Sequence, residues 1–222
     1  SFGRTQPVES LEKAALDLLA EAYNPRVVGI DFLSNEDGHP ALEKGQLVYG
    51  QVLKAVKEDR SKLHRTMHSG EIGDGRNPRD ALILGSERLG HAVLLSEDPV
   101  TLELASRRKV PVEVNLASNL RLTKVEKIAN HPFLKYLRLG LPISLSTDDE
   151  GIFDTDIAHE CELAVAETDI TYSELKQMAY NSIDTAFASD GDKAGLRARL
   201  QDKFQVFEKQ MAGGFHSSPT TR

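Results

Sequence analysis

The sequence has 222 residues, of which 40% are hydrophobic and 27% are charged, as is ordinary for a globular domain with its own core. Its formal net charge of -7 argues against a nucleic-acid partner, because proteins that bind phosphate backbones are usually basic. The single cysteine, Cys161, excludes an intrachain disulfide and a zinc site built from several cysteines. No apolar run approaches the roughly 20 residues that cross a bilayer, so we expect no membrane partner.

Helical patterns follow one another along the chain, separated by short β-rich runs. Each helix is marked by a side chain that can cap its first turn, by an early proline, or by apolar residues that share one face. In chain order, the expected helices cover residues 10–22 with Ser10 as the cap, residues 40–57, the segments that follow Asn77-Pro78 and Asp98-Pro99, residues 132–139, and the segment that begins with the capping box Thr171 to Glu174.

Five short β-rich runs alternate with these helices, and the first and the last of them are apolar. They cover residues 27–32, 65–69, 88–93, 111–116 and 142–146. Strands that alternate with helices at intervals of roughly 25 to 35 residues predict an α/β fold with a parallel sheet. This pattern alone allows either a doubly wound sheet or a (β/α) barrel.

Polar groups at the ends of the predicted strands favour the barrel. The five groups are Asp31, His68, His91, Asn115 and Asp148. A barrel gathers functional groups from many strands at one rim, whereas an open sheet gathers its ligands mainly at a switch point. We therefore expect a partial barrel domain over residues 1–210, followed by a disordered C-terminal tail over residues 211–222.

The strongest chemical signal is the acidic run at Asp148, Asp149 and Glu150, which directly follows the last predicted strand. Neighbouring carboxylates repel one another, so their clustering costs free energy unless a cation or a ligand compensates. The run therefore indicates a metal or substrate site, and the alternative is a charged loop that caps a helix.

Two histidines end neighbouring predicted strands. His68 is followed by Gly70, which permits a tight turn, and by the acid Glu71. This stretch is either a metal-binding imidazole beside an acid or a surface turn with an ordinary histidine and glutamate. His91 is either a second polarising group or a core histidine bonded to the backbone. Because a catalytic zinc usually takes three or more protein ligands, these residues alone indicate a metal-assisted hydrolase that lacks part of its metal shell.

The other polar groups are expected to have structural roles. Ser118 and Asn119 follow the fourth predicted strand and would cap an element or hold the rim together. The run from Ser34 to Asp37 follows the first predicted strand and either contacts a ligand or forms a turn. The sequence assigns no partner to the remaining histidines, which are His39, His64, His131, His159 and His216.

Taken together, several motifs resemble the adenosine/AMP deaminase family in order and spacing. They are His68-Ser69-Gly70-Glu71, Arg88-Leu89-Gly90-His91, Ser118-Asn119 and Ser146-Thr147-Asp148-Asp149, supported by Gly29-Ile30-Asp31, Asn130-His131-Pro132 and Asn181-Ser182. The resemblance runs from about residue 27 to residue 181, and the Glu36-Asp37 pair is most similar to the adenosine deaminase-related growth factor branch. It implies a (β/α)8 barrel of the TIM type, to which this chain supplies about the last five βα units.

The resemblance also implies a role for each matching residue. His68 and Asp148 would be ligands of one zinc ion per complete site. Glu71 would donate a proton to N1 of a purine ring, and His91 would position and polarise the attacking water. Asp149 would hydrogen-bond N7 of the ring. The implied reaction is the zinc-dependent hydrolytic deamination of a purine nucleoside, with adenosine giving inosine and ammonia.

This sequence departs from the family pattern at several positions. Ser34 would lie beside the purine where the family usually has glycine, Ala92 replaces another usual glycine, and Glu150 replaces a usual proline. The family also begins with a His-x-His pair that supplies two zinc ligands, and this sequence contains no such pair. We therefore expect either a missing N-terminal segment or a homo-oligomer.

Two other functions fit the same residues. One is a non-catalytic barrel remnant that binds a nucleoside or a partner protein, because part of the metal shell is missing. The other is a different metal-dependent amidohydrolase, because fold does not determine function. The compartment stays open between cytoplasmic and exported, since a single cysteine is compatible with both.

Overall fold

The computed structural model describes residues 1–21, 26–58 and 61–213. The chain divides into two compact units, Ser1–Phe187 and Ala188–Arg222. The expected division into a barrel domain over residues 1–210 and a tail over residues 211–222 stays a prediction. Most of that tail, from residue 214 onward, lies outside the described residues.

The first unit contains a six-stranded sheet in which all neighbouring strands are parallel and stand in chain order. The strands are β1 (Phe2–Gly3), β2 (Gly29–Leu33), β3 (His64–Ser69), β4 (Arg88–His91), β5 (Val112–Val114) and β6 (Ile143–Leu145). In the described part of the chain this order never reverses, so the sheet has the winding of a barrel and lacks the switch point of a doubly wound fold. The five predicted strands and the barrel type of fold are confirmed.

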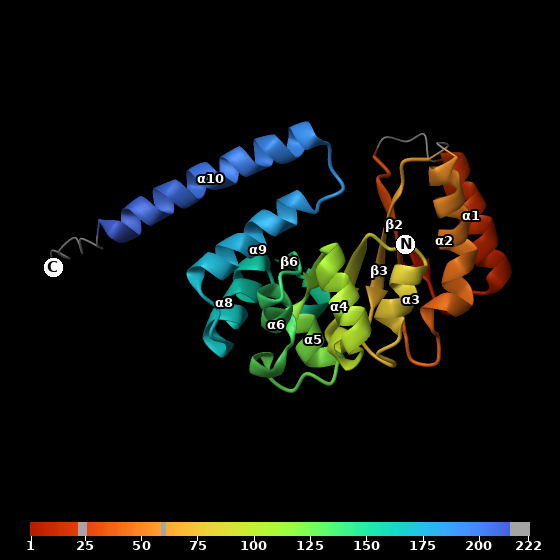
Figure 1. Cartoon of the computed structure of the whole chain (residues 1–222), viewed down its shortest axis with the longest axis horizontal. Coiled ribbons are helices and arrows are strands. Elements are labelled where there is room, and N and C mark those ends of the chain that lie inside the picture. Colours follow the sequence, from red (N-terminus) through yellow and green to blue (C-terminus); the bar gives the residue numbers. More distant parts are fainter. Residues whose placement is uncertain (22–25, 59–60, 214–222) are drawn as a thin grey trace. The chain divides into compact units, whose positions relative to one another are not determined.

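Helices connect the strands, and the colours of Figure 1 advance along the sheet from α1 to α9 in chain order. The helices of this unit are α1 (Val8–Glu21), α2 (Ala41–Lys57), α3 (Asn77–Ile83), α4 (Pro99–Arg108), α5 (Leu116–Leu122), α6 (Phe133–Arg138), α7 (Glu150–Phe153), α8 (Ile157–Glu167) and α9 (Tyr172–Asp184), with two short 3-10 helices, η1 (Val93–Glu97) and η2 (Ile128–Asn130).

The second unit contains one long helix, α10 (Asp190–Ala212), whose first turn is capped by the Ser189 side chain. Its residues are mostly exposed, and none of them is buried. Among the described helices, α10 included, none combines the length and the hydropathy that a bilayer crossing requires.

Two of the predicted helix caps are confirmed. The Asp98 side chain accepts hydrogen bonds from backbone N–H groups in the first turn of α4. Thr171 and Glu174 form a reciprocal capping box at the start of α9, where each side chain accepts from the backbone N–H of the other residue. In both places the side chain satisfies N–H groups that have no partner within the helix.

Two other predicted caps are wrong. Ser10 lies inside α1, which begins at Val8. Asn77 is the first residue of α3, and its Oδ1 accepts instead from the backbone N–H of Ala41 at 3.0 Å. The Asn77 side chain therefore joins α3 to the start of α2, a long-range contact that the local sequence does not reveal.

The core lies between the sheet and its helices. Leu11 and Ala15 of α1 are fully buried, as their spacing on one helix face predicts, and they belong to the same apolar cluster as Phe32 and Met67. Burial alternates along β3, so Met67 is buried while His68 faces the opposite side of the sheet and is half-buried. The alternation thus keeps one face of β3 for packing and leaves the other face for chemistry.

Candidate active site

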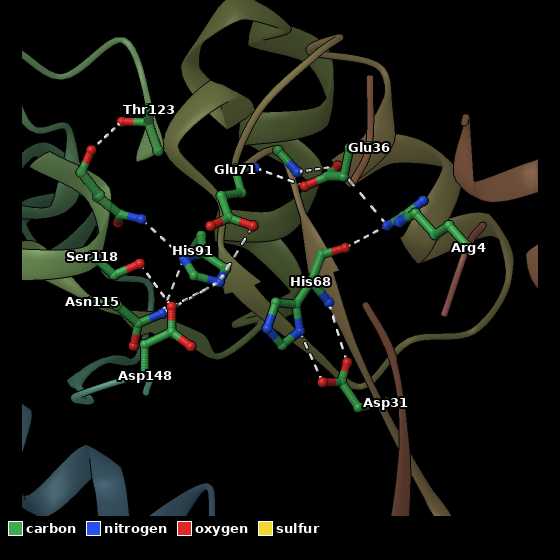
Figure 2. Close-up of polar contacts among 12 residues, drawn as sticks. Arg4, Asp31, Glu36, His68, Glu71, His91, Asn115, Ser118, Thr123 and Asp148 are labelled. Atoms are coloured by element: carbon green, nitrogen blue, oxygen red, sulfur yellow. Dashed lines mark hydrogen bonds and ion pairs between the residues drawn. The ribbon is translucent and has the colours of Figure 1, made fainter. Parts of the chain in front are cut away.

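Four of the predicted site residues, His68, Glu71, His91 and Asp148, converge at the carboxyl ends of β3, β4 and β6 (Figure 2). Ligand atoms of His68, His91 and Asp148 all lie within 4.8 Å of one another, and the two imidazole rings have centroids 4.9 Å apart. Nε2 of His91 lies 3.8 Å from Glu71 Oε2 and 3.9 Å from Asp148 Oδ2. The parallel sheet therefore gathers two imidazoles and two carboxyl groups from three different βα units.

His68 is held by a carboxylate on the neighbouring strand. Asp31 Oδ2 lies 2.8 Å from Nδ1 of His68, and Asp31 Oδ1 accepts from the backbone N–H of His68 at 3.3 Å. Burial opposes the charged form of His68, but the hydrogen bond to Asp31 and the nearby carboxylates outweigh it and raise the pKa of His68. Because Asp31 occupies Nδ1, Nε2 is the nitrogen left to bind a metal, an arrangement typical of metal-ligating histidines.

The Asp148 carboxylate is also fixed by a hydrogen bond from a second side chain, Ser118. The hydroxyl of Ser118, at the start of α5, donates to Asp148 Oδ2 at 2.7 Å. The backbone of Asp148 has a φ of 57°, in the left-handed region that non-glycine residues seldom adopt. Such strained residues persist where the surrounding structure fixes them, and they cluster at functional sites. The expected structural role of Ser118 is thus to position a candidate metal ligand.

Glu71 lies on a turn whose backbone is fixed by hydrogen bonds to the buried acid Glu36. Glu36, only 2% exposed, accepts hydrogen bonds from the backbone N–H groups of Gly70 at 2.8 Å and Glu71 at 2.9 Å. Arg4 approaches Glu36 Oε2 to 3.9 Å and donates to the carbonyl oxygen of His68, as Figure 2 shows. Since Arg4 and Glu36 bind the backbone on both sides of the turn, they set where the Glu71 side chain begins.

The carboxyl group of Glu71 is suited to donate a proton near neutral pH. Burial, as the largest cause, raises the pKa of Glu71 from its ordinary value of 4.5 to about 7. A general acid works best when its pKa lies near the working pH, because it then holds the proton and still releases it readily.

His91 is almost completely buried, with 1% of its surface exposed. Its Nδ1 lies 3.0 Å from Nδ2 of Asn115 and 2.9 Å from Nδ2 of Asn119. Burial lowers the pKa of His91 well below its usual value, so the imidazole is neutral. The interpretation of His91 as a core histidine bonded to the backbone is replaced by a buried histidine held by two side-chain amides, with its other nitrogen facing the site.

The remaining predicted site residues lie at the same rim, and their roles stay predictions. Asp149 is exposed and immediately precedes α7, where its side chain makes no cap. Ser34 follows β2 and is half-buried, with a φ of 89°. Ala92 follows β4 with a φ of 50°. Glycine adopts such angles without a steric cost, so the glycine that the resemblance implies at each of these two positions would be less strained than Ser34 or Ala92.

The chain matches the family model described as adenosine deaminase over residues 4–203. Adenosine deaminase from Aliivibrio fischeri (strain ATCC 700601 / ES114) is 33% identical over 197 residues, which make up 88% of this chain and 56% of that protein. The chain spans about half the length of the curated relatives it matches.

Solved structures of deaminases share the fold. The crystal structure of adenine deaminase from Arthrobacter aurescens is 30% identical with a TM-score of 0.82, over 92% of this chain and 60% of that chain. The arabidopsis protein ADAL complexed with IMP is 27% identical with a TM-score of 0.75, over 90% of this chain and 56% of that chain. The narrower resemblance to the growth factor branch stays a prediction. The matched family model, the level of identity and the shared barrel together show that this chain belongs to the adenosine deaminase family.

Proposed function

We propose that the protein catalyses zinc-dependent hydrolytic deamination of a purine nucleoside, converting adenosine and water to inosine and ammonia. The observation that carries this proposal is the cluster of His68, Asp148 and His91, with the proton-bearing acid Glu71 3.8 Å from His91. Relatives named for the deamination of adenosine or adenine, and one complexed with the purine nucleotide IMP, support a purine substrate.

His68 and Asp148 would hold the zinc ion. One imidazole nitrogen and one carboxylate oxygen suit zinc, and each ligand is fixed by a second side chain, Asp31 or Ser118. When bound, zinc lowers the pKa of a water molecule towards 7 and so makes hydroxide available. A catalytic zinc usually takes at least three protein ligands. We propose that the others come from a further segment of the protein or from a second copy of the chain.

The chain's own residues would perform the remaining steps. Glu71 donates its proton to N1 of the purine, which draws electrons from C6 and makes that carbon electrophilic. His91 orients the water that attacks C6, and Asp149 hydrogen-bonds N7 to fix the ring. As the water oxygen bonds to C6, one proton of the water passes to the amino nitrogen, the bond from C6 to that nitrogen breaks, and ammonia leaves. The other proton of the water returns to Glu71.

The test uses the complete gene product that contains this sequence. We expect it to bind zinc and to convert adenosine to inosine, followed by the absorbance change of the ring. A screen with purines, pyrimidines and hydantoins separates a purine deaminase from another amidohydrolase. Nucleoside binding without release of ammonia from any adenine or guanine compound would overturn the proposal in favour of a non-catalytic barrel.

Removing the carboxylate behind His68 should weaken zinc binding. We expect Asp31→Ala to lower zinc affinity by about 10- to 100-fold, because the imidazole loses the partner that fixes its orientation and its basicity. Competition with a chelator measures the affinity. The control is Glu113→Gln, since Glu113 is also partly buried on the sheet but pairs with Arg88. Equal affinities for Asp31→Ala and the unchanged protein would contradict the role given to Asp31.

A substitution at Glu36, which holds the turn of Gly70 and Glu71, should slow the reaction more than it weakens substrate binding. We expect Glu36→Gln to lower kcat by about 10- to 100-fold, because glutamine offers one oxygen to two backbone N–H groups and the Glu71 turn shifts. Steady-state kinetics with adenosine measure kcat and KM separately. The exposed neighbour Asp37 supplies the control, Asp37→Asn. A change in KM alone would show that Glu36 acts on substrate binding instead.

A further inference from the structure

The ring of His91 presents Nε2 to the site, and that nitrogen can serve in two opposite ways. With a lone pair it would bind a metal together with His68 and Asp148, whose ligand atoms lie within 4.8 Å. With a proton it would donate a hydrogen bond instead. A neutral imidazole carries one proton on one of its two nitrogens, so the tautomer of His91 decides its role.

The contacts of a second buried histidine begin to fix this tautomer. The backbone N–H of Phe133 donates to Nδ1 of His131 at 3.1 Å. A backbone N–H only donates, so Nδ1 of His131 carries no proton. Burial lowers the pKa of His131 to about 3, which leaves the ring neutral with its proton on Nε2. That Nε2 lies 3.0 Å from Oδ1 of Asn119, which accepts the hydrogen bond.

The orientation of the Asn119 amide follows from this contact. The oxygen and nitrogen of an amide are hard to distinguish by position alone, and the hydrogen-bond network has to assign them. Here the N–H of His131 requires an oxygen in front of it, so the other end of the amide is the NH2 group. This group lies 2.9 Å from Nδ1 of His91 and only donates. Nδ1 of His91 is therefore the acceptor, and the proton of His91 resides on Nε2.

We propose that Asn119 and His131 are positioning residues that fix His91 in the tautomer with its proton on Nε2. The chemical use of this tautomer rests on the proposed function. Nε2 of His91 lies 3.8 Å from Oε2 of Glu71 and 3.9 Å from Oδ2 of Asp148. His91 accordingly offers a hydrogen-bond donor to the reacting atoms, and the metal is left to His68 and Asp148.

A second amide reaches the same nitrogen but gives no direction by itself. Nδ2 of Asn115 lies 3.0 Å from Nδ1 and 3.5 Å from Nε2 of His91, and Oδ1 of Asn115 is buried without a hydrogen-bond partner among the described residues. Either end of this amide could face the ring. The direction is set by Asn119, which is itself fully buried and is held by His131.

The tautomer can be read directly by NMR. In long-range proton–nitrogen correlation spectra of the complete gene product labelled with 15N-histidine, each neutral tautomer gives its own pattern of cross-peaks. His91→Gln identifies the signals of His91. We expect Nε2 of His91 to carry the proton in the unchanged protein, with and without zinc. A proton on Nδ1 would overturn the proposal.

A substitution at Asn119 reverses the direction of the hydrogen bond between this residue and Nδ1 of His91. Asn119→Asp replaces the NH2 group with an oxygen, which accepts where the amide donated. We expect a proton to appear on Nδ1 of His91 and kcat to fall at least about tenfold, with a smaller change in KM. Asn130→Asp, an exposed position next to His131, adds the same charge and should leave the His91 spectrum unchanged. An unchanged His91 spectrum in Asn119→Asp would refute the proposal that Asn119 fixes the tautomer of His91.

A second pair of variants tests the outer histidine. His131→Leu removes the donor to Asn119, so the amide can turn and we expect both tautomers of His91. His131→Gln keeps an N–H near the position of Nε2 and should restore the single tautomer. Because the spectra need no turnover, the two proposals fail separately. If the expected tautomer is found but the protein does not deaminate, only the proposed function is refuted. If the protein deaminates with the proton of His91 on Nδ1, only the positioning role of Asn119 and His131 is refuted.

Discussion

Glu71→Gln is expected to lower kcat for adenosine deamination by about 10²- to 10⁴-fold, the range that general acid catalysis contributes. Glutamine has the same shape as glutamic acid but has no acidic proton to give to N1 of the ring. The fold and zinc content should remain, because the turn is held through backbone N–H groups and not through the Glu71 side chain. Rapid-mixing or steady-state absorbance assays measure the rate, and KM should change little.

The pH dependence of the reaction rate of the unchanged protein is a second test of the role of Glu71. The pKa of Glu71 is raised to about 7, so the carboxyl group is protonated below that pH and loses its proton above it. Because the reaction needs the protonated form, kcat/KM should fall as pH rises above about 7. The exposed residue Glu43 on α2 supplies a matched control, Glu43→Gln, which should keep both the rate and the pH profile. Full activity in Glu71→Gln would remove this residue from the mechanism.

Asp148→Ala should abolish stable zinc binding and lower the deamination rate by about 10³-fold or more. The activation of water by zinc contributes several kcal/mol, and each 1.36 kcal/mol corresponds to about a factor of ten. Alanine removes a candidate ligand and leaves the hydroxyl of Ser118 without its carboxylate partner. Metal analysis of the purified protein measures zinc, and the adenosine assay measures the rate.

A distant acid provides the control for this exchange. Asp202 lies exposed on α10, in the second unit, so Asp202→Ala should retain zinc and activity. Thermal melting of both variants shows whether the fold survives. Asp148→Ala with a full complement of zinc would mean that His68 binds the metal with other ligands and that Asp148 is not one of them.

The sequence predicts most of the fold because each strand of this unit, except β1, lies in a short β-rich run between helical patterns. Such periodicity is a local property that needs no knowledge of distant residues. β1 is only Phe2–Gly3, which is too short to show any period, and its place in the sheet depends on pairing with β2. Ser10 and Asn77 were assigned as caps from their neighbours alone, and tertiary contacts decide otherwise.

The site was predictable where a functional group ends a strand. His68, His91 and Asp148 meet because the carboxyl ends of parallel strands lie along one edge of the sheet. The supporting groups were not predictable. Asp31 was recognised as a strand-end acid without a role, and Glu36 as a turn or ligand contact. Their partners are 34 to 37 residues away along the chain, so no local pattern shows them.

His131 shows most clearly what the sequence could not reveal. A lone histidine next to a proline is usually structural, and nothing nearby in the sequence suggests another role. Its link to His91 passes through Asn119, with separations of 12 and 28 residues. The direction of the hydrogen bonds depends on the backbone N–H of Phe133, a group that every residue except proline carries.

The chain-order arrangement of the sheet has an evolutionary consequence. Three side chains that hold the site residues do so across neighbouring βα units. Asp31 contacts His68, Ser118 contacts Asp148, and Asn119 contacts His91. A substitution or an insertion in one loop therefore disturbs the adjoining unit first and leaves the rest of the rim in register. The loop that carries Ser34 shows this coupling, because it also carries Glu36, whose carboxylate accepts from the backbone N–H groups of Gly70 and Glu71; a change of its length would therefore shift the turn on the adjoining unit.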